Sequence, residues 1–142
     1  MGAQGLILLD THVLIWLTME PARIGESTAE IIRGETIAQS VLFSPISTWE
    51  VSMLVDKRKL DLGSSMRVWV KRLLVMAGVN IASLTPEIAA EAGELLPPIH
   101  GDPADRIIIA TARALGCPLI TADRKILAYA AAGHVRAIDA RR

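Results

Sequence analysis

Four acidic residues stand at the ends of apolar segments or near the starts of helical segments. They are Asp10, Glu50, Asp105 and Asp123. Carboxylates held within a few ångströms of one another repel, which raises their pKa values unless a cation compensates. Mg²⁺ and Mn²⁺ are hard cations that take oxygen ligands, and Mg²⁺ commonly binds substrate phosphate as well. If the fold gathers the four side chains, the pattern predicts a Mg²⁺ or Mn²⁺ site in which all four are metal ligands and catalytic residues for phosphodiester hydrolysis.

The segment His100–Arg113 shows how such an acid could be positioned. Asp102 is a favourable N-cap and Pro103 a favourable first helical residue, because the N–H that proline lacks has no helical partner there. Asp105 then lies in the first turn, near the positive end of the helix dipole. From Ile107 onward the segment is apolar almost all round, which indicates a buried helix.

Short apolar runs alternate with helical segments along the chain. The expected strands are Leu6–Leu9, Val41–Phe43, Val79–Leu84, Leu119–Thr121 and, as a fifth, Val135–Ile138. The expected helices are His12–Met19, Ser27–Arg33 ended by Gly34, Ile46–Lys57, Ser65–Ala77, Pro86–Pro97, a central helix from Pro103 to Gly116, and Arg124–Ala132. This alternation predicts an α/β three-layer sandwich, with a central parallel sheet of four or five strands flanked by helices. Ligands bind at the carboxyl ends of such strands, where the four acids are expected.

Each acid also has a purely structural interpretation. Asp10 is a common residue in a solvated turn, and Asp123 is a good N-cap for the last helix. Ser47 and Glu50 fit a capping box, while Asp105 complements the helix dipole. Taken singly, these roles explain the acids as well as metal binding does. Their convergence on one edge of a sheet favours a site, because independent caps have no reason to gather there.

Composition limits the kind of protein. The chain has 142 residues, 51% of them hydrophobic, and a mean hydropathy of +0.40. We expect one domain, residues 1–142, with an apolar surface that a partner covers. The net charge is zero, so binding to nucleic acid must rest on local patches. The single cysteine, Cys117, excludes an internal disulfide, and the lack of a long apolar run or signal sequence predicts a cytoplasmic protein without membrane contact.

Four ordered motifs carry a resemblance to a known family. They are ILLDTHVLIWL at residues 7–17, STWE at 47–50 followed by KRKLDL, LPPIHGDPADRIIIATAR at 96–113, and PLITAD at 118–123. In this order and spacing they resemble the PIN-domain family, and within it the VapC-type toxin ribonucleases of type II toxin–antitoxin systems. The resemblance covers nearly the whole chain. It implies that the family's acidic metal-site positions are Asp10, Glu50, Asp105 and Asp123, accompanied by the hydroxyls of Thr11, Ser47 and Thr121.

Other positions bear on the site without belonging to it. The family often has lysine where Leu54 stands, glycine where Arg58 stands and an aromatic residue where Ala104 stands. These departures concern packing and RNA contact, and the four acids are intact. Asp102 fits helix capping better than metal binding and is left outside the expected site. For Arg106 three roles stay open: neutralising the acids, meeting a phosphate, or forming a surface ion pair.

The resemblance implies an Mg²⁺- or Mn²⁺-dependent endoribonuclease, the toxin of a VapBC-type pair, neutralised by a cognate VapB-like antitoxin and assembled as a homodimer. The apolar segments Met66–Met76 and Val13–Leu17 are the expected contact surfaces for these partners. Two alternatives stay open: a housekeeping PIN-like nuclease of RNA processing, or a non-catalytic interaction module whose acids are caps. Trp16, Trp49 and Trp69 lie on apolar helical stripes, so we expect them in a core or interface rather than in a base-stacking site.

Overall fold

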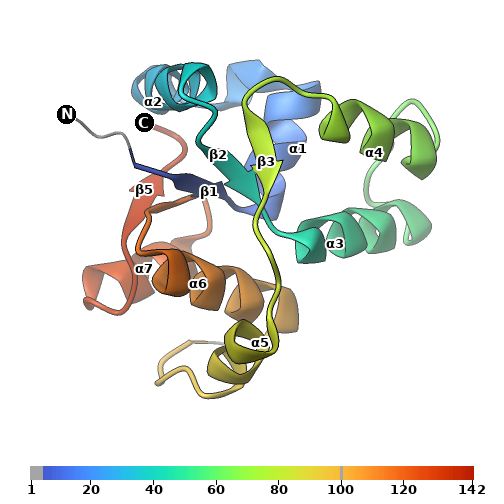
Figure 1. The fold of residues 1–142 in the computed structure, drawn as a ribbon. Coiled ribbons are helices and arrows are strands. Elements are labelled where there is room, and N and C mark those ends of the chain that lie inside the picture. Colours follow the sequence, from blue (N-terminus) through green and yellow to red (C-terminus); the bar gives the residue numbers. More distant parts are fainter. Residues whose placement is uncertain (1–4, 100) are drawn as a thin grey trace.

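Five parallel strands form the centre of the fold (Figure 1). In the computed structural model, which describes residues 5–99 and 101–142, they are β1 (Ile7–Leu9), β2 (Val41–Phe43), β3 (Val79–Ile81), β4 (Leu119–Thr121) and β5 (Ala137–Asp139). Their order is β3-β2-β1-β4-β5, so the first strand is the central one. The parallel sheet is confirmed, including its fifth strand. That strand begins later than expected, and β3 ends at Ile81 rather than Leu84.

The central strand β1 pairs with a strand on each side. Ile7 lies opposite Val41 of β2, and Leu8 lies opposite Leu119 of β4. A strand covered on both faces buries every side chain, and so it is apolar throughout rather than alternating. Leu8 and Leu9 accordingly have no solvent-exposed surface. Residues that follow directly after this strand are therefore held at the centre of the carboxyl edge of the sheet.

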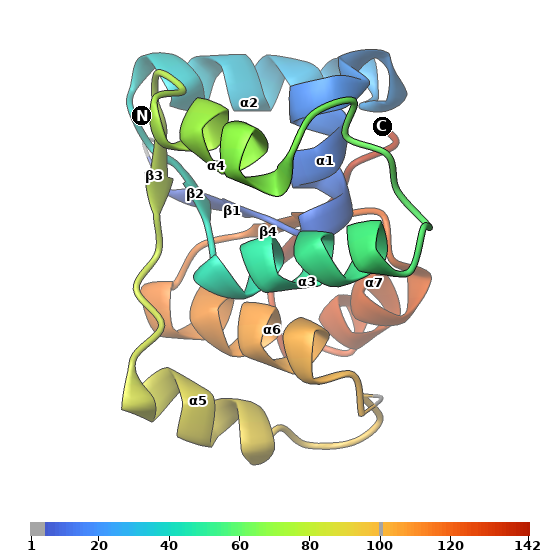
Figure 2. The same ribbon diagram turned by 90° about the vertical axis from the view of Figure 1, so that its right-hand side faces the viewer.

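Helices cover both faces of the sheet (Figure 2). They are α1 (Thr11–Met19), α2 (Glu26–Ile37), α3 (Pro45–Asp56), α4 (Met66–Leu74), α5 (Pro86–Gly93), α6 (Pro103–Leu115) and α7 (Arg124–Ala131), with a short 3-10 helix at Pro21–Arg23. Figure 2 shows α1, α2 and α4 on one side of the sheet, α6 and α7 on the other, and α5 outside α6. One core cluster joins the sheet to Val13 of α1, and a second joins it to Ile108 of α6 and Ile126 of α7. The expected three-layer arrangement is confirmed.

The helix α6 forms as the sequence predicts. The Oδ1 atom of Asp102 accepts a hydrogen bond from the Asp105 N–H at 3.2 Å, and Pro103 is the first helical residue. Gly116 ends the helix in a left-handed conformation with φ 62°. Ile108, inside the helix, has no exposed surface. Neither α6 nor any other helix in the described part of the chain is long and apolar enough to cross a membrane.

The helix α5 ends earlier than expected, at Gly93 rather than at Pro97. Pro97 has no N–H to bond the Gly93 carbonyl four residues earlier, and a contact with α6 meets this end of the helix instead. The guanidinium of Arg106 donates from Nε to the Ala92 carbonyl at 2.8 Å and from Nη2 to the Gly93 carbonyl at 3.3 Å. These carbonyls have no partner within the helix, so the arginine stabilises its end. Arg106 therefore ties α5 to α6, which is none of the three roles considered from the sequence.

The helix α2 is longer than expected, because it continues through Gly34 to Ile37. A glycine inside a helix costs only about 1 kcal/mol relative to alanine. Contacts of the same helix outweigh this cost: Ile32 is buried with 3% exposure, and the Thr36 hydroxyl donates to the Ile32 carbonyl at 2.7 Å. Tertiary packing thus overrides the local stop signal.

Gly78, before β3, cannot carry a side chain. Its φ is +76°, and a Cβ atom there would lie 2.1 Å from the backbone oxygen of Thr36. We expect Gly78→Ala to lower the free energy of unfolding by about 3 kcal/mol, because the chain must shift away from α2. The matched control is Gly34→Ala, where the added methyl meets nothing within 4 Å and should stabilise α2 by about 1 kcal/mol. Urea denaturation of both variants tests this, and equal midpoints would contradict the close approach.

Candidate active site

Asp10 follows the central strand directly and is 4% exposed. It is the N-cap of α1, and its Oδ1 accepts a hydrogen bond from the Thr11 N–H at 2.8 Å. The hydroxyl of Thr121, at the end of β4, donates to its Oδ2 at 2.6 Å. Each carboxylate oxygen thus has a donor, one from α1 and one from the neighbouring strand. These two contacts give the carboxylate one defined orientation at the carboxyl edge of the sheet.

Asp123 lies beyond β4 at the same edge. Its Oδ1 accepts hydrogen bonds from the N–H groups of Lys125 at 2.8 Å and Ile126 at 3.2 Å, so it is the N-cap of α7. Its own N–H donates to the Thr121 hydroxyl oxygen at 3.0 Å. A chain of hydrogen bonds therefore runs from the Asp123 backbone through Thr121 to the Asp10 carboxylate.

Glu50 projects from α3, and the capping box considered for it does not form. The N-cap of α3 is Ser44, whose hydroxyl oxygen accepts from the Ile46 N–H at 3.2 Å. Ser47 lies inside the helix, fully buried, and its hydroxyl is hydrogen-bonded to that of Thr11 at 2.9 Å. The Oε1 atom of Glu50 is buried and has no hydrogen-bond partner within the described residues. A buried carboxylate oxygen without a partner is costly unless a cation or another donor meets it.

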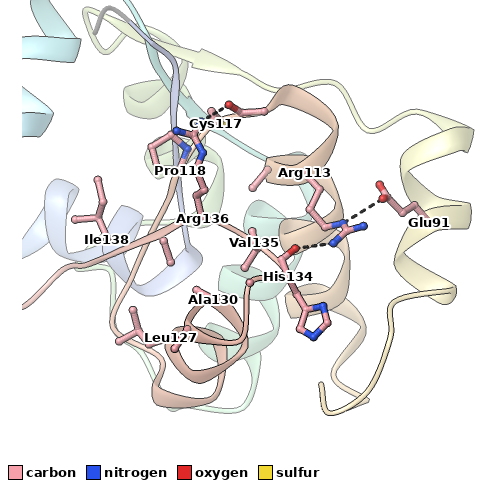
Figure 3. A pocket seen from close by; sticks show the side chains of 15 residues that line it. Glu91, Arg113, Cys117, Pro118, Leu127, Ala130, His134, Val135, Arg136 and Ile138 are labelled. Carbon is pink, nitrogen blue, oxygen red and sulfur yellow. Dashed lines mark hydrogen bonds and ion pairs between the residues drawn. The ribbon is translucent and has the colours of Figure 1, made fainter. Parts of the chain in front are cut away.

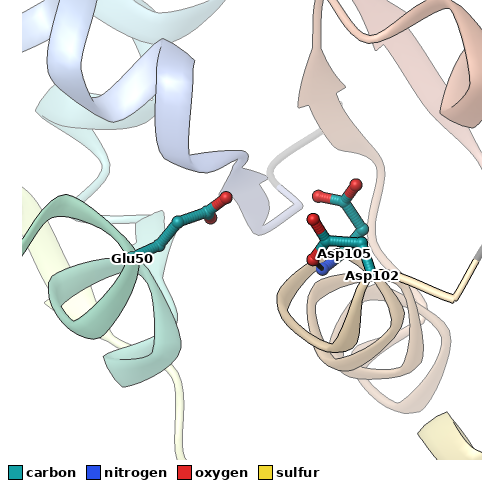
Figure 4. A group of neighbouring side chains, drawn as sticks. All are labelled: Glu50, Asp102 and Asp105. Atoms are coloured by element: carbon teal, nitrogen blue, oxygen red, sulfur yellow. Dashed lines mark hydrogen bonds between the residues drawn. The ribbon is translucent and has the colours of Figure 1, made fainter. Parts of the chain in front are cut away.

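Three carboxylates face one another between α3 and α6 (Figure 4). Glu50, Asp102 and Asp105 each place one oxygen within 4.8 Å of the others. Figure 4 shows Glu50 on one side of the gap and the two aspartates on the other. Asp102 thus caps α6 and also contributes to this acidic cluster, which we define as Glu50, Asp102 and Asp105. The sequence did carry a signal for it, because residues three apart on a helix lie on one face.

The charges of the site act on one another. Burial and, after it, the charges of Asp10, Asp102, Glu50 and Asp123 together raise the pKa of Asp105 to about 8. Burial also raises the pKa of Asp10, against the hydrogen bond from Thr121. The pKa of Glu50 is raised by burial and by the charges of Asp10 and Asp102, while the nearby Thr11 hydroxyl lowers it. Asp10 and Asp123 therefore lie close enough to act electrostatically on the acidic cluster.

These residues fit a divalent cation. All the available donors are carboxylate oxygens, which suit hard ions such as Mg²⁺ and Mn²⁺. One of them, Glu50 Oε1, is buried without a hydrogen bond, and the pKa values of three of the carboxyl groups are raised. A cation would offset this repulsion and lower those pKa values again.

Not every residue singled out in the sequence lies in the site. His134 stacks on Tyr129, with ring centroids 4.4 Å apart, while His12 is exposed close to the acids, where its charge lowers the pKa of Asp10. His100 lies outside the described residues. Trp16 and Trp69 are buried as expected, with 8% and 2% exposure. The third tryptophan, Trp49, is 49% exposed and does not lie in the core, so of its two expected places only an interface stays a prediction.

A cavity of about 1010 Å³ lies at the opposite edge of the sheet from the acids, before β4 and β5 (Figure 3). Arg113 contacts the Glu91 carboxylate at 3.1 Å and the His134 carbonyl, and Arg136 donates to the Gly116 carbonyl. Each of these arginines thus has a structural contact. None of the four acids lines this cavity. The candidate active site is therefore the acidic region at the carboxyl edge of the sheet.

Comparison with known proteins agrees with this fold. The family model of the PIN domain matches residues 7–132, and the chain belongs to the PIN-domain family. Among curated proteins it is similar to Ribonuclease VapC22 of Mycobacterium tuberculosis (strain ATCC 25618 / H37Rv). The two are 32% identical over 123 residues, which cover 87% of this chain and 91% of that protein. The expected resemblance to VapC-type PIN proteins is confirmed.

Solved structures share the fold over nearly the whole chain. VapBC2 from Rickettsia felis, bound to a DNA fragment from their promoter, contains a chain with a TM-score of 0.68 and 16% identity, covering 94% of this chain and 97% of that one. FitAcB from Neisseria gonorrhoeae gives 0.58 and 22%, with 94% and 97% covered. A toxin–antitoxin complex from Klebsiella pneumoniae gives 0.57 and 21%, with 94% and 96% covered. At these identities the likeness concerns the fold.

Proposed function

We propose that this protein is a metal-dependent endoribonuclease and the toxin of a VapBC-type toxin–antitoxin pair. The observation that carries the proposal is the acidic cluster, next to Asp10, at the carboxyl edge of a PIN-domain sheet. The relative that is 32% identical is a ribonuclease by name, which supports hydrolysis of RNA as the reaction. A ribonuclease toxin meets its substrate in the cytoplasm, where we place this protein.

The proposed metal is Mg²⁺ or Mn²⁺. The proposed ligands and catalytic residues are Asp10, Glu50, Asp105 and Asp123, with Asp102 added because it belongs to the acidic cluster. When bound, such a cation supplies electrostatic stabilisation to a scissile phosphate and lowers the pKa of a water molecule. Asp10 and Asp123 keep their capping roles as well, because an N-cap carboxylate has lone pairs left for a second partner.

The hydroxyl residues orient the proposed ligands. Thr121 donates to Asp10 Oδ2 and fixes the rotation of that carboxylate. Thr11 and Ser47 join α1 to α3 through their buried hydroxyls, which sets the position of α3 and so of Glu50. We propose that these residues are positioning groups, because Thr121 contacts the Asp10 carboxylate directly and Thr11 and Ser47 act through the placement of α3.

The proposed partners are RNA, a VapB-like antitoxin and a second copy of the chain. Two structural neighbours, VapBC2 from Rickettsia felis and the toxin–antitoxin complex from Klebsiella pneumoniae, are assemblies of this kind by name, which supports the antitoxin. The end of α4 offers apolar surface for a partner, since Leu74 is 56% exposed and Val75 82%. The other expected contact segment is wrong in part: Val13 and Leu14 of α1 are fully buried in the core.

Metal removal tests the proposed reaction. We expect antitoxin-free protein to cleave labelled RNA in the presence of Mg²⁺ or Mn²⁺, to stop in chelator, and to resume when the cation is returned in excess. Cleavage should occur at internal positions of the RNA, and a comparison of end-labelled with internally labelled substrate will show this. Cleavage that continues undiminished in chelator would contradict the proposed metal site.

A further inference from the structure

A small cavity of about 260 Å³ adjoins the acidic cluster. It is lined by Glu50 and Asp102, by Trp49, Lys57 and Lys59, and by the apolar residues Met53, Leu54, Pro103 and Ala104. Pockets for drug-sized ligands run from about 300 to 1,000 Å³, so this cavity suits a single flat group rather than a helix or a strand. Its lining combines an aromatic ring and two cations with two carboxylates and an apolar remainder.

Trp49 is exposed in this cavity for a reason that local structure explains. It precedes Glu50 on α3, and Met53 and Lys57 follow it at intervals of four residues, so these side chains form one stripe along the helix. The other two tryptophans are 8% and 2% exposed, against 49% for Trp49. The core therefore does not explain why an aromatic residue stands at this position, because an exposed indole ring contributes little of the stabilisation that its burial would give.

The two lysines bring positive charge to the same cavity. Lys57 ends α3, and Arg58 then takes a left-handed conformation with φ 58°, which turns the chain so that Lys59 also lines the cavity. Within the described residues neither lysine forms an ion pair. An aromatic face with adjacent free cations is the arrangement by which proteins hold single-stranded nucleic acid, because the ring stacks on a base and the cations meet phosphates.

We propose that this cavity is a nucleotide subsite for single-stranded RNA, in which one base stacks on the indole of Trp49 and Lys57 and Lys59 contact the flanking phosphates. The inference rests on the proposed ribonuclease function and specifies how its substrate is held. Charge and an aromatic face together favour RNA over a protein partner, because Lys57 and Lys59 can meet phosphates while Trp49 offers a ring on which a base can stack. The stacked nucleotide then neighbours the phosphate at the acids.

Intrinsic fluorescence gives a direct test, because Trp49 is the exposed one of the three tryptophans. A single-stranded RNA oligonucleotide of mixed sequence, added in chelator so that it is not cleaved, should quench the fluorescence of the unmodified protein. Trp49→Phe should lose this quenching. Trp49→Ala should weaken the binding of fluorescein-labelled RNA at least about fivefold and raise KM more than it changes kcat. The matched control is Ser52→Ala, an exposed position on α3 that does not line the cavity.

The lysines have a separate readout. Changing both Lys57 and Lys59 to alanine should weaken RNA binding and also reduce its dependence on salt, because fewer phosphates are neutralised. RNA that binds without quenching, or with unchanged affinity for Trp49→Ala, would overturn the proposal, as would a failure to bind RNA at all. A third result would also overturn it: the unmodified protein sediments as a dimer, Trp49→Ala sediments as a monomer, and the two bind RNA with equal affinity. Quenching without metal-dependent cleavage would instead refute the proposed reaction and leave the subsite standing.

Discussion

Replacing Asp10 with asparagine should reduce the rate of RNA cleavage by at least about a hundredfold while leaving the fold intact. Asparagine is as good an N-cap as aspartate, so α1 keeps its start. Its amide oxygen can accept the Thr11 N–H, and its NH₂ group can donate to the Thr121 hydroxyl, which also has acceptor lone pairs. What the substitution removes is the negative charge at the centre of the carboxyl edge, and with it a ligand for a cation.

The control for Asp10→Asn is Asp56→Asn, an exposed acid at the end of α3 that belongs to neither the cluster nor the cavity. Both variants are compared with the unmodified protein by far-UV circular dichroism and by initial cleavage rates on the same RNA. We expect Asp56→Asn to cleave normally. A folded Asp10→Asn protein that cleaves at the unmodified rate would remove Asp10 from the site and return it to the role of a helix cap.

The metal-free protein should lose stability as the pH rises. The pKa of Asp105 is about 8 in the folded protein, against an ordinary value of 3.8. Between these pH values the folded state retains a proton that the unfolded state has lost, so the free energy of unfolding falls as the pH increases. The slope for one such group is about 1.4 kcal/mol per pH unit, and Asp10 and Glu50, whose pKa values are also raised, act in the same direction.

Two changes should flatten this pH dependence. Asp105→Asn cannot ionise, so in chelator it should be more stable than the unmodified protein, by an amount that is smallest at pH 5, grows with pH and exceeds about 2 kcal/mol at pH 8. Saturating Mg²⁺ should stabilise the unmodified protein most at high pH, where the carboxylates are ionised, and should have little effect on Asp105→Asn. Urea denaturation at pH 5, 6, 7 and 8 measures each case. A metal-free stability that rises from pH 5 to pH 8 would contradict the repulsion at this site.

The parts of the fold that follow from local sequence could be predicted. The continuous apolar runs before Asp10 and Asp123 become buried parallel strands, because a covered strand has no solvent face to make polar. The start of α6 followed from Asp102 and Pro103 for a similar reason, since capping depends on neighbours in sequence. Convergence of the acids at one edge then followed from the parallel topology rather than from any single motif.

Features that depend on contacts distant in sequence were not predictable. The cap on the end of α5 is Arg106, which belongs to another helix, and so no residue within α5 signals this contact. The exposure of Trp49 depends on what lies across from α3, and an apolar stripe alone does not show whether another element covers it. Ser47 has a sequence environment typical of a capping box, but Ser44 begins the helix and leaves Ser47 to contact Thr11.

Calorimetric titration of the purified, antitoxin-free protein with Mg²⁺ and with Mn²⁺ tests the proposed site most directly, because it needs no knowledge of the RNA target. Performed near pH 7 in buffers of different ionisation enthalpy, it also counts the protons released. We expect saturable binding with proton release, since Asp105 must ionise to become a ligand, and binding at least about tenfold weaker in Glu50→Gln and Asp105→Asn. Absence of saturable binding, or equal binding by these variants and Asp56→Asn, would contradict a metal site at these acids.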